Sequence, residues 1–316
     1  MNEPVVTPLP VTSVFRKETI LNGTPVQIDC IEVGGQLFSV RKGLLTVACL
    51  EDEWYEDLKN PAGVIAGLRQ ACELRADLLT FWQRPPYTEP VHPYYYEWES
   101  VASLPVTSYQ HWWDKQIKSR VRNHIRKAEK EGLVVRETLY DDEFVRGMTA
   151  IFNESPIRQG RRFWHYGKDF ETVRRQFSRY ISREYMVGAY FQGQMVGFMM
   201  LGNAGRFGLT GQIISSLAHR DKAPNHAMVA KAVEICAAHN LSHLVYYYWT
   251  DDSLSEFKRR CGFEETRLPR YYVPLTWRGE LALRLGAHRR FRAMVPASIR
   301  AMLKRARARW YGRVKS

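Results

Sequence analysis

Carboxylates and phenols gather around one apolar run in the C-terminal half of the chain. Residues 244–249 predict a β-strand that contains Tyr246 and Tyr248, and Asp251 and Asp252 follow it directly. Open α/β sheets bind ligands beyond the carboxyl ends of their strands, so each aspartate is a candidate proton acceptor and each tyrosine a candidate proton donor. A structural interpretation stays open for both pairs, with the aspartates capping the next helix and the tyrosines packing within the strand.

Arginines form a second group of residues that can bind a ligand. Arg158, Arg161, Arg162 and His165 lie in one short aromatic loop. Guanidinium groups hold carboxylate and phosphate with two parallel hydrogen bonds, so this loop is a candidate site for an anionic acceptor. An ordinary surface loop explains the same residues. The histidines of the chain lack the spacing of metal ligands, and we expect no metal site.

A third group precedes a helix that Pro224 is predicted to open. His219, Arg220 and Lys222 come just before that proline. Helix N-termini attract anions through free N–H groups and the helix dipole, so this group predicts a phosphate-bearing ligand. A solvated basic loop is the alternative.

Hydrophobic periodicity predicts the elements that must position these groups. The expected helices of the second half are 108–132, 142–153, 170–183, 224–239 and 253–260, and the expected strands begin at 134, 185, 195, 207, 244 and 271. This order combines an antiparallel meander with a β-α-β crossover and therefore predicts a mixed α/β sheet.

The first half has a shorter order of the same kind. Strands flank a Gly34-Gly35 turn, a helix follows at 62–74, and a buried strand follows at 78–82. The similar order indicates a degenerate duplicate, although no residue-level repeat supports it. We therefore expect three parts, with boundaries at 1–107, 108–275 and 276–316.

The C-terminal half resembles a known family. The segments that carry the resemblance are K-x-R-x4-I-R-K-A at 118–128, the hairpin at 185–201, P-N-H-A-M at 224–228 and F-K-R-R-C-G-F at 257–263. Their order and spacing resemble GNAT superfamily acyltransferases of the FemAB-like branch. The resemblance implies a GNAT-like mixed sheet flanked by helices, built as a tandem of a degenerate N-terminal and a complete C-terminal domain.

The resemblance also implies where an acyl donor binds. In this superfamily, main-chain N–H groups of a splayed central strand, here 207–214, bind the oxyanion of the tetrahedral intermediate. Gly211 would allow a β-bulge in that strand, whereas a plain core strand with a tolerated glycine is the alternative. The residues that the resemblance adds to the donor site are Thr210, Gly211, Gln212, Asn225, His226 and Lys258.

The loop before Pro224 departs from the usual GNAT pattern. Ordinary members bind the donor pyrophosphate with Arg/Gln-x-x-Gly-x-Gly/Ala, and here Ala223 and Asn225 replace the glycines after Arg220. Glycines allow backbone N–H groups to approach phosphate closely. FemAB-like proteins also lack these glycines, so the departure favours that branch.

The activity implied by the resemblance is N-acyl transfer. Acyl-CoA (acetyl-CoA) or a carrier thioester would supply the acyl group, and a small-molecule or lipid-linked amine, such as a cell-envelope sugar or precursor, would accept it. Two alternatives stay open. One is aminoacyl-tRNA as the donor, as in the peptidoglycan-bridge members of the branch. The other is an inactive GNAT-like module that binds an anion or a membrane.

The net charge of +13 is concentrated at the C-terminus. From Arg270 onward there are eleven arginines and two lysines against Glu280. A helix predicted from Pro296 has an apolar face that ends at Trp310, so residues 296–316 are expected to bind an anionic membrane surface. RNA is a second anionic partner, and a solubilising tail is the remaining alternative.

Cysteine usage and hydropathy predict a cytoplasmic protein, and the basic C-terminus predicts peripheral attachment to the inner membrane face. The five cysteines are odd in number and lack C-x-x-C spacing, which is typical of a reducing compartment. The first residues lack the pattern of a secretory signal. The uncharged stretch 187–205 has a Gln-Gly-Gln turn at its centre, so it predicts a hairpin instead of a membrane span.

Overall fold

The computed structural model describes residues 7–21, 24–250 and 253–289. The first half of the chain contains β1 (Val11–Leu21), β2 (Thr24–Val33), β3 (Gln36–Arg41), β4 (Val47–Leu50), α1 (Pro61–Gln70), β5 (Leu78–Trp82) and β6 (Tyr96–Pro105). The second half begins with α2 (Tyr109–His111), the π-helix η1 (Trp112–Gln116), α3 (Ser119–Lys130), β7 (Val134–Thr138), α4 (Asp142–Asn153), β8 (Ile157–Arg158), β9 (Arg161–Arg162), α5 (Phe170–Phe177) and the 3₁₀ turn η2 (Ile181–Arg183). It continues with β10 (Glu184–Phe191), β11 (Gln194–Asn203), β12 (Phe207–Ser215), η3 (Arg220–Lys222), α6 (Pro224–Ala238), β13 (His243–Tyr248), α7 (Ser253–Arg260), β14 (Glu264–Pro274) and α8 (Trp277–Arg284).

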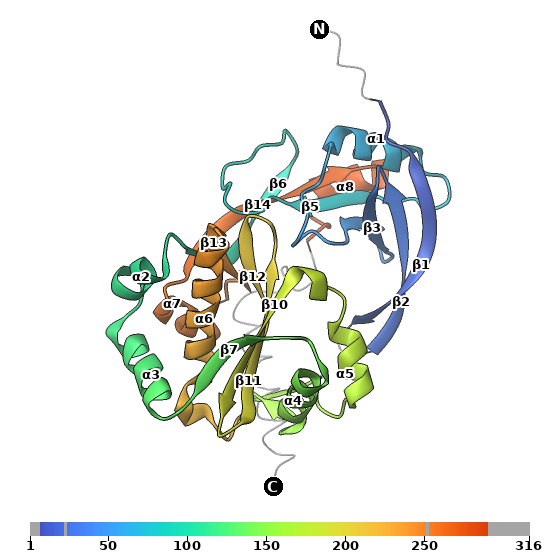
Figure 1. Ribbon diagram of the computed structural model, residues 1–316. Coiled ribbons are helices and arrows are strands. Elements are labelled where there is room, and N and C mark those ends of the chain that lie inside the picture. Colours follow the sequence, from blue (N-terminus) through green and yellow to red (C-terminus); the bar gives the residue numbers. More distant parts are fainter. Residues whose placement is uncertain (1–6, 22–23, 251–252, 290–316) are drawn as a thin grey trace.

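One twelve-stranded sheet runs through the molecule, and its strand order repeats about the centre (Figure 1). Strands β1 to β4 form an antiparallel meander, and α1 then leads to β5, which is parallel to β4. Strands β7, β10, β11 and β12 form the same meander, and α6 leads to β13, which is parallel to β12. The mixed sheet and the two similar halves expected from the sequence are therefore confirmed.

The last strand of each half is exchanged with the other half. Strand β6 pairs with β13, β14 pairs with β5, and the two exchanged strands pair with each other at the centre of the sheet. The halves therefore share one backbone hydrogen-bond network, and the residue boundaries 1–107, 108–275 and 276–316 stay a prediction.

The helices that follow the two meanders start alike. Asn60 and Ala223 both have a left-handed backbone, with φ of 44° and 51°, and a proline follows each of them at the first turn of the helix. A left-handed backbone is uncommon for residues other than glycine. The shared geometry supports the internal duplication that the strand order indicates, and it fixes where α6 begins relative to β12.

Helices cover both faces of the C-terminal half of the sheet. Side chains of α3 and α6 pack on one face, and side chains of α4 pack on the other. Met199 and Met200 are neighbours on β11 and belong to these two different clusters, as the period of two along a strand requires. Figure 1 shows α3 beside α6 on one side of these strands and α4 and α5 on the other.

Three helix predictions were wrong in extent. The helix expected over 62–74 ends at Gln70, because Ala71 has an extended backbone with ψ of 118°. The helix expected over 108–132 is interrupted because Ile117 and Lys118 are extended, with ψ of 150° and 151°. Trp112 explains the break, since its buried indole donates to the carbonyl oxygen of Cys261 at 3.0 Å and holds this segment against the end of α7. The helix expected over 170–183 ends at Phe177 and resumes only as the turn η2.

The hairpin prediction for 187–205 is confirmed. Strands β10 and β11 pair antiparallel around Gln192 and Gly193, whose φ values are 51° and 79°. No helix within the described ranges combines the length and the hydropathy that crossing a bilayer requires.

Two partly buried ion clusters join the halves. Arg270 on β14 contacts Glu53 at 2.9 Å and Glu99 on β6 at 2.7 Å. Asp57 lies between Arg84 and Arg206, which contact it at 3.0 Å and 2.8 Å. Both clusters hold the segment 51–57 of the first half against the second half, which positions that segment for the site described below.

Candidate active site

Strands β12 and β13 separate after a short parallel pairing. They pair from Phe207 with His243 to Leu209 with Val245, and in the described part of the chain their pairing ends there. Beyond it, 210–215 and 246–248 diverge toward the carboxyl ends of the two strands. This is the opening that the sequence led us to expect in the central strand.

A β-bulge lies where the two strands part. Leu201 of β11 pairs with Thr210 and Met200 pairs with Gln212, so Gly211 is the extra residue on β12. The predicted bulge at Gly211 is confirmed. A bulged residue is left out of the ladder, so its main chain can bind another group. The Thr210 side chain is buried within the core, whereas Gly211 and Gln212 line a cavity.

This cavity of about 240 Å³ lies on the face of the sheet that α5 covers. Its walls come mainly from the bulge of β12, the segment 176–180 at the end of α5, and the 51–55 segment of the first half, with single residues from β10, β11 and β13. The polar and aromatic residues that line it are Glu51, Asp52, Trp54, Tyr55, Gln176, Phe177, Arg179, Tyr180, Glu184, Gln212 and Tyr247. Both halves of the chain therefore contribute to one pocket, which we call the bulge cavity.

Glu184 is the titratable group nearest to the bulge. It opens β10, and a Cβ atom on Gly211 would lie 3.5 Å from its Oε1. Burial raises the pKa of Glu184 from its ordinary value of 4.5 to about 7, although a hydrogen bond from Tyr55 acts in the opposite direction. A carboxyl group with this pKa exchanges protons readily near neutral pH.

Tyr55 connects the first half of the chain to this carboxyl group. Its hydroxyl donates to Glu184 Oε1 at 3.1 Å, and its ring stacks on Tyr180 with centroids 4.6 Å apart. Tyr180 in turn donates a hydrogen bond to Asp52. Burial raises the pKa of both phenols, so both stay protonated and act as hydrogen-bond donors.

The two tyrosines predicted as proton donors lie in different surroundings. Tyr246 packs into the core on the α6 face, with its ring 5.9 Å from that of Phe263, and burial raises its pKa. Tyr248 is 41% exposed, and its ring lies 5.6 Å from that of Trp54. Tyr247 between them has a φ of 44° and lines the bulge cavity, which the sequence did not lead us to expect.

Lys258 stabilises the divergent end of β13. This lysine is 2% exposed, and its Nζ donates to the carbonyl oxygens of Tyr246 at 2.7 Å and Tyr248 at 2.8 Å. Its ammonium group also lies 4.5 Å from the centre of the Tyr246 ring. Lys258 therefore fixes the main chain at the end of β13 by donating to two of its carbonyl oxygens. The predicted bases Asp251 and Asp252 follow this strand and lie outside the described residues.

Several main-chain N–H groups at the start of α6 already have partners. The N–H groups of Lys222, Ala223 and His226 donate to carbonyl oxygens within the loop, and Pro224 has no N–H group. The N–H group of Leu217 donates to the Glu154 carboxylate at 2.7 Å. A carboxylate of this chain and internal turns therefore use some of the donors that an ordinary pyrophosphate loop would offer.

The predicted donor-site residues near this helix start divide into two groups. Lys222 forms ion pairs with Glu131 and Asp221, and His219 contacts the hydroxyl of Ser216 at 3.0 Å. Arg220 belongs to the turn η3.

Asn225 and His226 lie at the helix tip itself. Asn225 Oδ1 is buried and has no hydrogen-bond partner among the described residues. His226 stacks on His124 of α3, with ring centres 5.0 Å apart. Burial first, and then the charges of His124, Arg260 and Arg120, lower the pKa of His226 to about 4, so its imidazole is neutral at pH 7.

The arginines predicted to bind an acceptor do not act together. Arg158 is directed inward and donates to the carbonyl oxygens of Ser215 and Ile151 and to Glu154. Arg161 and Arg162 are exposed on the short strand β9. His165 is buried and stacks on Phe152 with ring centres 4.5 Å apart, and burial lowers its pKa to about 4.

Glu184, Tyr55, Tyr180 and Asp52 are site residues that our sequence analysis did not identify. Glu184 is the acidic residue that opens the buried strand 185–191, and an acid at such a position is the one feature that would have marked it. Tyr55 is 129 residues away from it, so only the exchange of strands between the halves brings the two together.

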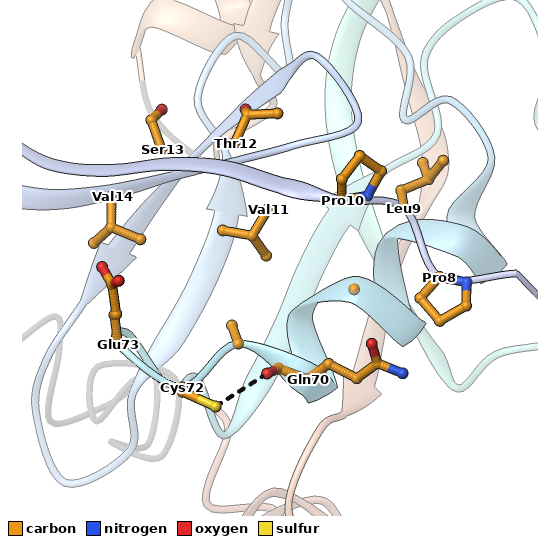
Figure 2. Close-up of a pocket in the computed structure, with 12 residues that line it drawn as sticks. Pro8, Leu9, Pro10, Val11, Thr12, Ser13, Val14, Gln70, Cys72 and Glu73 are labelled. Atoms are coloured by element: carbon orange, nitrogen blue, oxygen red, sulfur yellow. Dashed lines mark hydrogen bonds between the residues drawn. The ribbon is translucent and has the colours of Figure 1, made fainter.

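A second, larger cavity of about 520 Å³ lies in the first half, far from these groups in sequence. Figure 2 shows Pro8 to Val14 on one wall and Gln70, Cys72 and Glu73 after α1 on the other. Cys72 donates a hydrogen bond to the carbonyl oxygen of Gln70 at 3.5 Å. Glu73 and the Cys72 thiol are the titratable side chains among the residues that line it, and the thiol donates to the main chain, so this groove offers fewer chemical groups than the bulge cavity.

Across the described ranges, no three histidine, cysteine or acidic side chains are grouped so that they could hold a metal ion. The chemical groups of the candidate active site are a main-chain bulge, one carboxyl group of raised pKa, several phenols and the start of α6.

Comparison with known proteins found solved structures with a similar fold. No family model and no curated protein matches the sequence. Among solved structures, FemX aligns with 13% identity over 82% of this chain and 88% of its own, with a TM-score of 0.51. L-PGS from Bacillus licheniformis aligns with 13% identity over 75% of this chain and 81% of its own, with a TM-score of 0.52. At 13% identity, the similarity to these structures concerns the fold alone.

Proposed function

We propose that this chain, whose fold is the FemAB-like form of the GNAT fold, transfers an acyl group to an amine. The observation that supports this most is the place of Glu184. A carboxyl group with a pKa of about 7 lies beside the bulge at Gly211, where β12 and β13 begin to separate. Proton transfer and oxyanion binding are therefore available at one point.

The reaction would proceed by direct attack of the amine on the acyl carbon. Glu184 takes a proton from the amine, and main-chain N–H groups at the bulge stabilise the oxyanion of the tetrahedral intermediate. The bond from the acyl carbon to the carrier sulfur or oxygen then breaks, and the new amide remains. The leaving group takes up the proton that Glu184 accepted. Tyr55 keeps the carboxyl group oriented through its hydrogen bond.

The lining of the bulge cavity suits an acceptor that carries a positive charge before it reacts. Glu51, Asp52 and Glu184 supply carboxylates, and Tyr180 and Tyr247 supply aromatic faces. Carboxylates and aromatic faces together attract an ammonium group. We therefore propose a primary amine as the acceptor, in keeping with a cell-envelope sugar or a lipid-linked precursor.

The donor is a separate question, with acyl-CoA and aminoacyl-tRNA as candidates. The loop before α6 uses several of its N–H groups internally and lacks the usual glycines, which weighs against the pyrophosphate of acyl-CoA. Two cations lie near the helix tip, since Arg120 of α3 and Arg260 of α7 both act on His226, and Arg260 also pairs with Glu256. This distribution favours phosphates spaced along a basic surface, as in tRNA, over a compact pyrophosphate. We therefore propose an aminoacyl or acyl ester of tRNA as the donor, with acyl-CoA as the second candidate.

The membrane attachment predicted for residues 296–316 stays a prediction, because these residues lie outside the described ranges. An acceptor on a lipid carrier would make such attachment useful, since the enzyme and its substrate would share one surface.

Donor identity and catalysis can be tested together. Purified chain is incubated with a mixed pool of ¹⁴C-aminoacyl-tRNA, or with ¹⁴C-acetyl-CoA, and with a panel of amino sugars and aminoacyl lipids. We expect labelled amide from the tRNA pool. Product from acetyl-CoA alone would refute the donor assignment, and the absence of amide from both donors over the whole panel would favour an inactive binding module.

A further inference from the structure

Helix α8 carries an exposed apolar surface that the proposed reaction does not use. Its outward side chains Trp277, Leu281 and Leu285 are 76%, 48% and 71% exposed. Leu44, in the loop between β3 and β4, is 86% exposed, and its carbonyl oxygen accepts a hydrogen bond from Arg278 of α8 at 3.0 Å. We call Leu44, Trp277, Leu281 and Leu285 the α8 patch.

The spacing of the α8 patch places its side chains on one line. At roughly 100° per residue, Trp277, Leu281 and Leu285 lie at about 0°, 40° and 80° around the helix axis. On the same scale Arg284 lies at about −20° and Arg278 at about 100°. An apolar stripe is therefore bordered by an arginine on each side, which is typical of helices that lie in the interface of a membrane.

The orientation of this helix is fixed by the rest of the fold. Thr276 caps the helix by accepting from the N–H of Gly279, and it donates to Asp77 at 2.8 Å. Gly279 lies so close to the carbonyl oxygen of Asp77 that a side chain would not fit between them. Ala282 is buried on the same inner side. The apolar stripe therefore faces outward because the opposite side is locked to the sheet.

Cations outnumber acids beside the α8 patch. Arg41 and Lys42 precede Leu44 and are exposed, and Arg289 follows the helix. Lys42, Arg284 and Arg289 pair with Asp29, Glu280 and Glu97, whereas no ion pair is found for Arg41 or Arg278 among the described residues. The sequence after Arg289, outside the described ranges, contains seven arginines and two lysines and no acidic residue. Anionic lipid attracts such charges, and each one near the surface strengthens binding.

We propose that the α8 patch docks this protein onto the surface of an anionic lipid bilayer. Charge complementarity favours lipid phosphate, and the exposed tryptophan and leucines favour a partner with an apolar layer beneath its phosphates. RNA would leave the leucines in water. This surface is distinct from residues 296–316, and the inference holds whether or not the proposed transfer reaction is correct.

Vesicle sedimentation with the full chain tests the proposal. The vesicles contain either phosphatidylcholine alone or phosphatidylcholine with phosphatidylglycerol at three to one. The test variant is Trp277→Ala/Leu281→Ser/Leu285→Ser. The matched control is Leu139→Ser/Val134→Ser, because these side chains are also exposed, by 76% and 55%, but lie at the β7 edge of the sheet, whereas α8 packs against the central strand β14.

We expect the wild-type chain to bind the anionic vesicles and the control variant to bind equally well. The triple variant should lose at least tenfold in partition coefficient, with unchanged circular dichroism and Tm. Binding of the triple variant equal to that of the wild type would overturn the proposal, because the basic C-terminal sequence alone would then account for attachment. A wild-type chain that binds polyuridylic acid but neither vesicle, or a dimer that the triple variant converts to monomer, would also overturn it.

Discussion

Replacing Glu184 by glutamine should remove a pH-dependent loss of stability from this protein. The carboxyl group is buried beside the bulge, and burial raises its pKa from 4.5 to about 7. Glutamine has nearly the same shape and can still accept the hydrogen bond that Tyr55 donates. The substitution therefore changes the charge of the site and little else.

The sign of the effect follows from proton linkage. The folded state binds the Glu184 proton more tightly than the unfolded state, so the contribution of this proton to stability is fully present below about pH 4.5. It is lost as the pH rises through 7, where the buried carboxyl group ionises. A difference of 2.5 pKa units corresponds to about 3 kcal/mol, most of it lost between about pH 5 and pH 8.

The assay is urea unfolding of the wild type and of Glu184→Gln at pH 5 and at pH 8.5. The free energy of unfolding of Glu184→Gln, minus that of the wild type, should be about 2–3 kcal/mol larger at pH 8.5 than at pH 5, so that the variant gains relative stability at the higher pH. Glu137→Gln is the control, since Glu137 is exposed on β7 in the same sheet. Its difference from the wild type should not change with pH.

A pH-independent difference for Glu184→Gln would refute the reasoning. It would mean that the carboxyl group ionises at its ordinary pKa. The proposal that Glu184 acts as a base with a pKa near neutrality would then be contradicted.

Three further predictions concern the bulge, the buried lysine and the junction between the halves. Gly211→Val places its Cβ 3.1 Å from the carbonyl oxygen of Met200 and narrows the bulge cavity, so acyl transfer should fall at least tenfold while Tm changes by only a few degrees. Lys258→Met removes a charged donor from two partly buried carbonyl oxygens and should lower the free energy of unfolding by about 2–3 kcal/mol in urea titrations. Burial alone would raise the pKa of Asp57, but hydrogen bonds from two arginines lower it to about 2, so its contribution is present above about pH 4 and is lost as the pH falls toward 2. The Asp57 side chain is 46% exposed, so solvent screens its charge. Between pH 5 and pH 2.5, the free energy of unfolding of the wild type should therefore fall by only about 1 kcal/mol more than that of Asp57→Asn.

Local patterns in the sequence identified the parts of the site that depend on local structure. The run 207–214 with Gly211 predicted the bulged strand, and Pro224 predicted the start of α6. Both signals depend on backbone conformation within a few residues, and this is what hydrophobic period, glycine and proline encode.

Contacts between distant segments could not be predicted in this way. The bulge cavity takes Tyr55 from one half and Glu184 from the other, and the exchange of β6 and β14 is what brings these halves together. Nothing in the residues near Tyr55 indicates a partner 129 positions away. The basic loop at 158–162 was expected to present its arginines to an acceptor. Arg158 is instead directed inward, where it binds Glu154 and two carbonyl oxygens, and these partners also lie outside the loop.

The helix at 108–132 shows the limit of periodicity itself. Its apolar spacing continues through Ile117, and the break arises from the buried Trp112, whose hydrogen-bond acceptor is the carbonyl of Cys261 in the distant α7 segment. A tertiary contact therefore overrides a local preference that is otherwise consistent.

The rate of amide formation by Glu184→Gln tests the central claim most directly. Wild type, Glu184→Gln and Glu137→Gln are compared at pH 7.5 with the donor and amine that give product, and labelled amide is quantified by mass spectrometry. A general base at Glu184 predicts a loss of about 10²- to 10⁴-fold for Glu184→Gln and no loss for Glu137→Gln. Equal rates for all three proteins would contradict the claim that acyl transfer takes place at the bulge cavity.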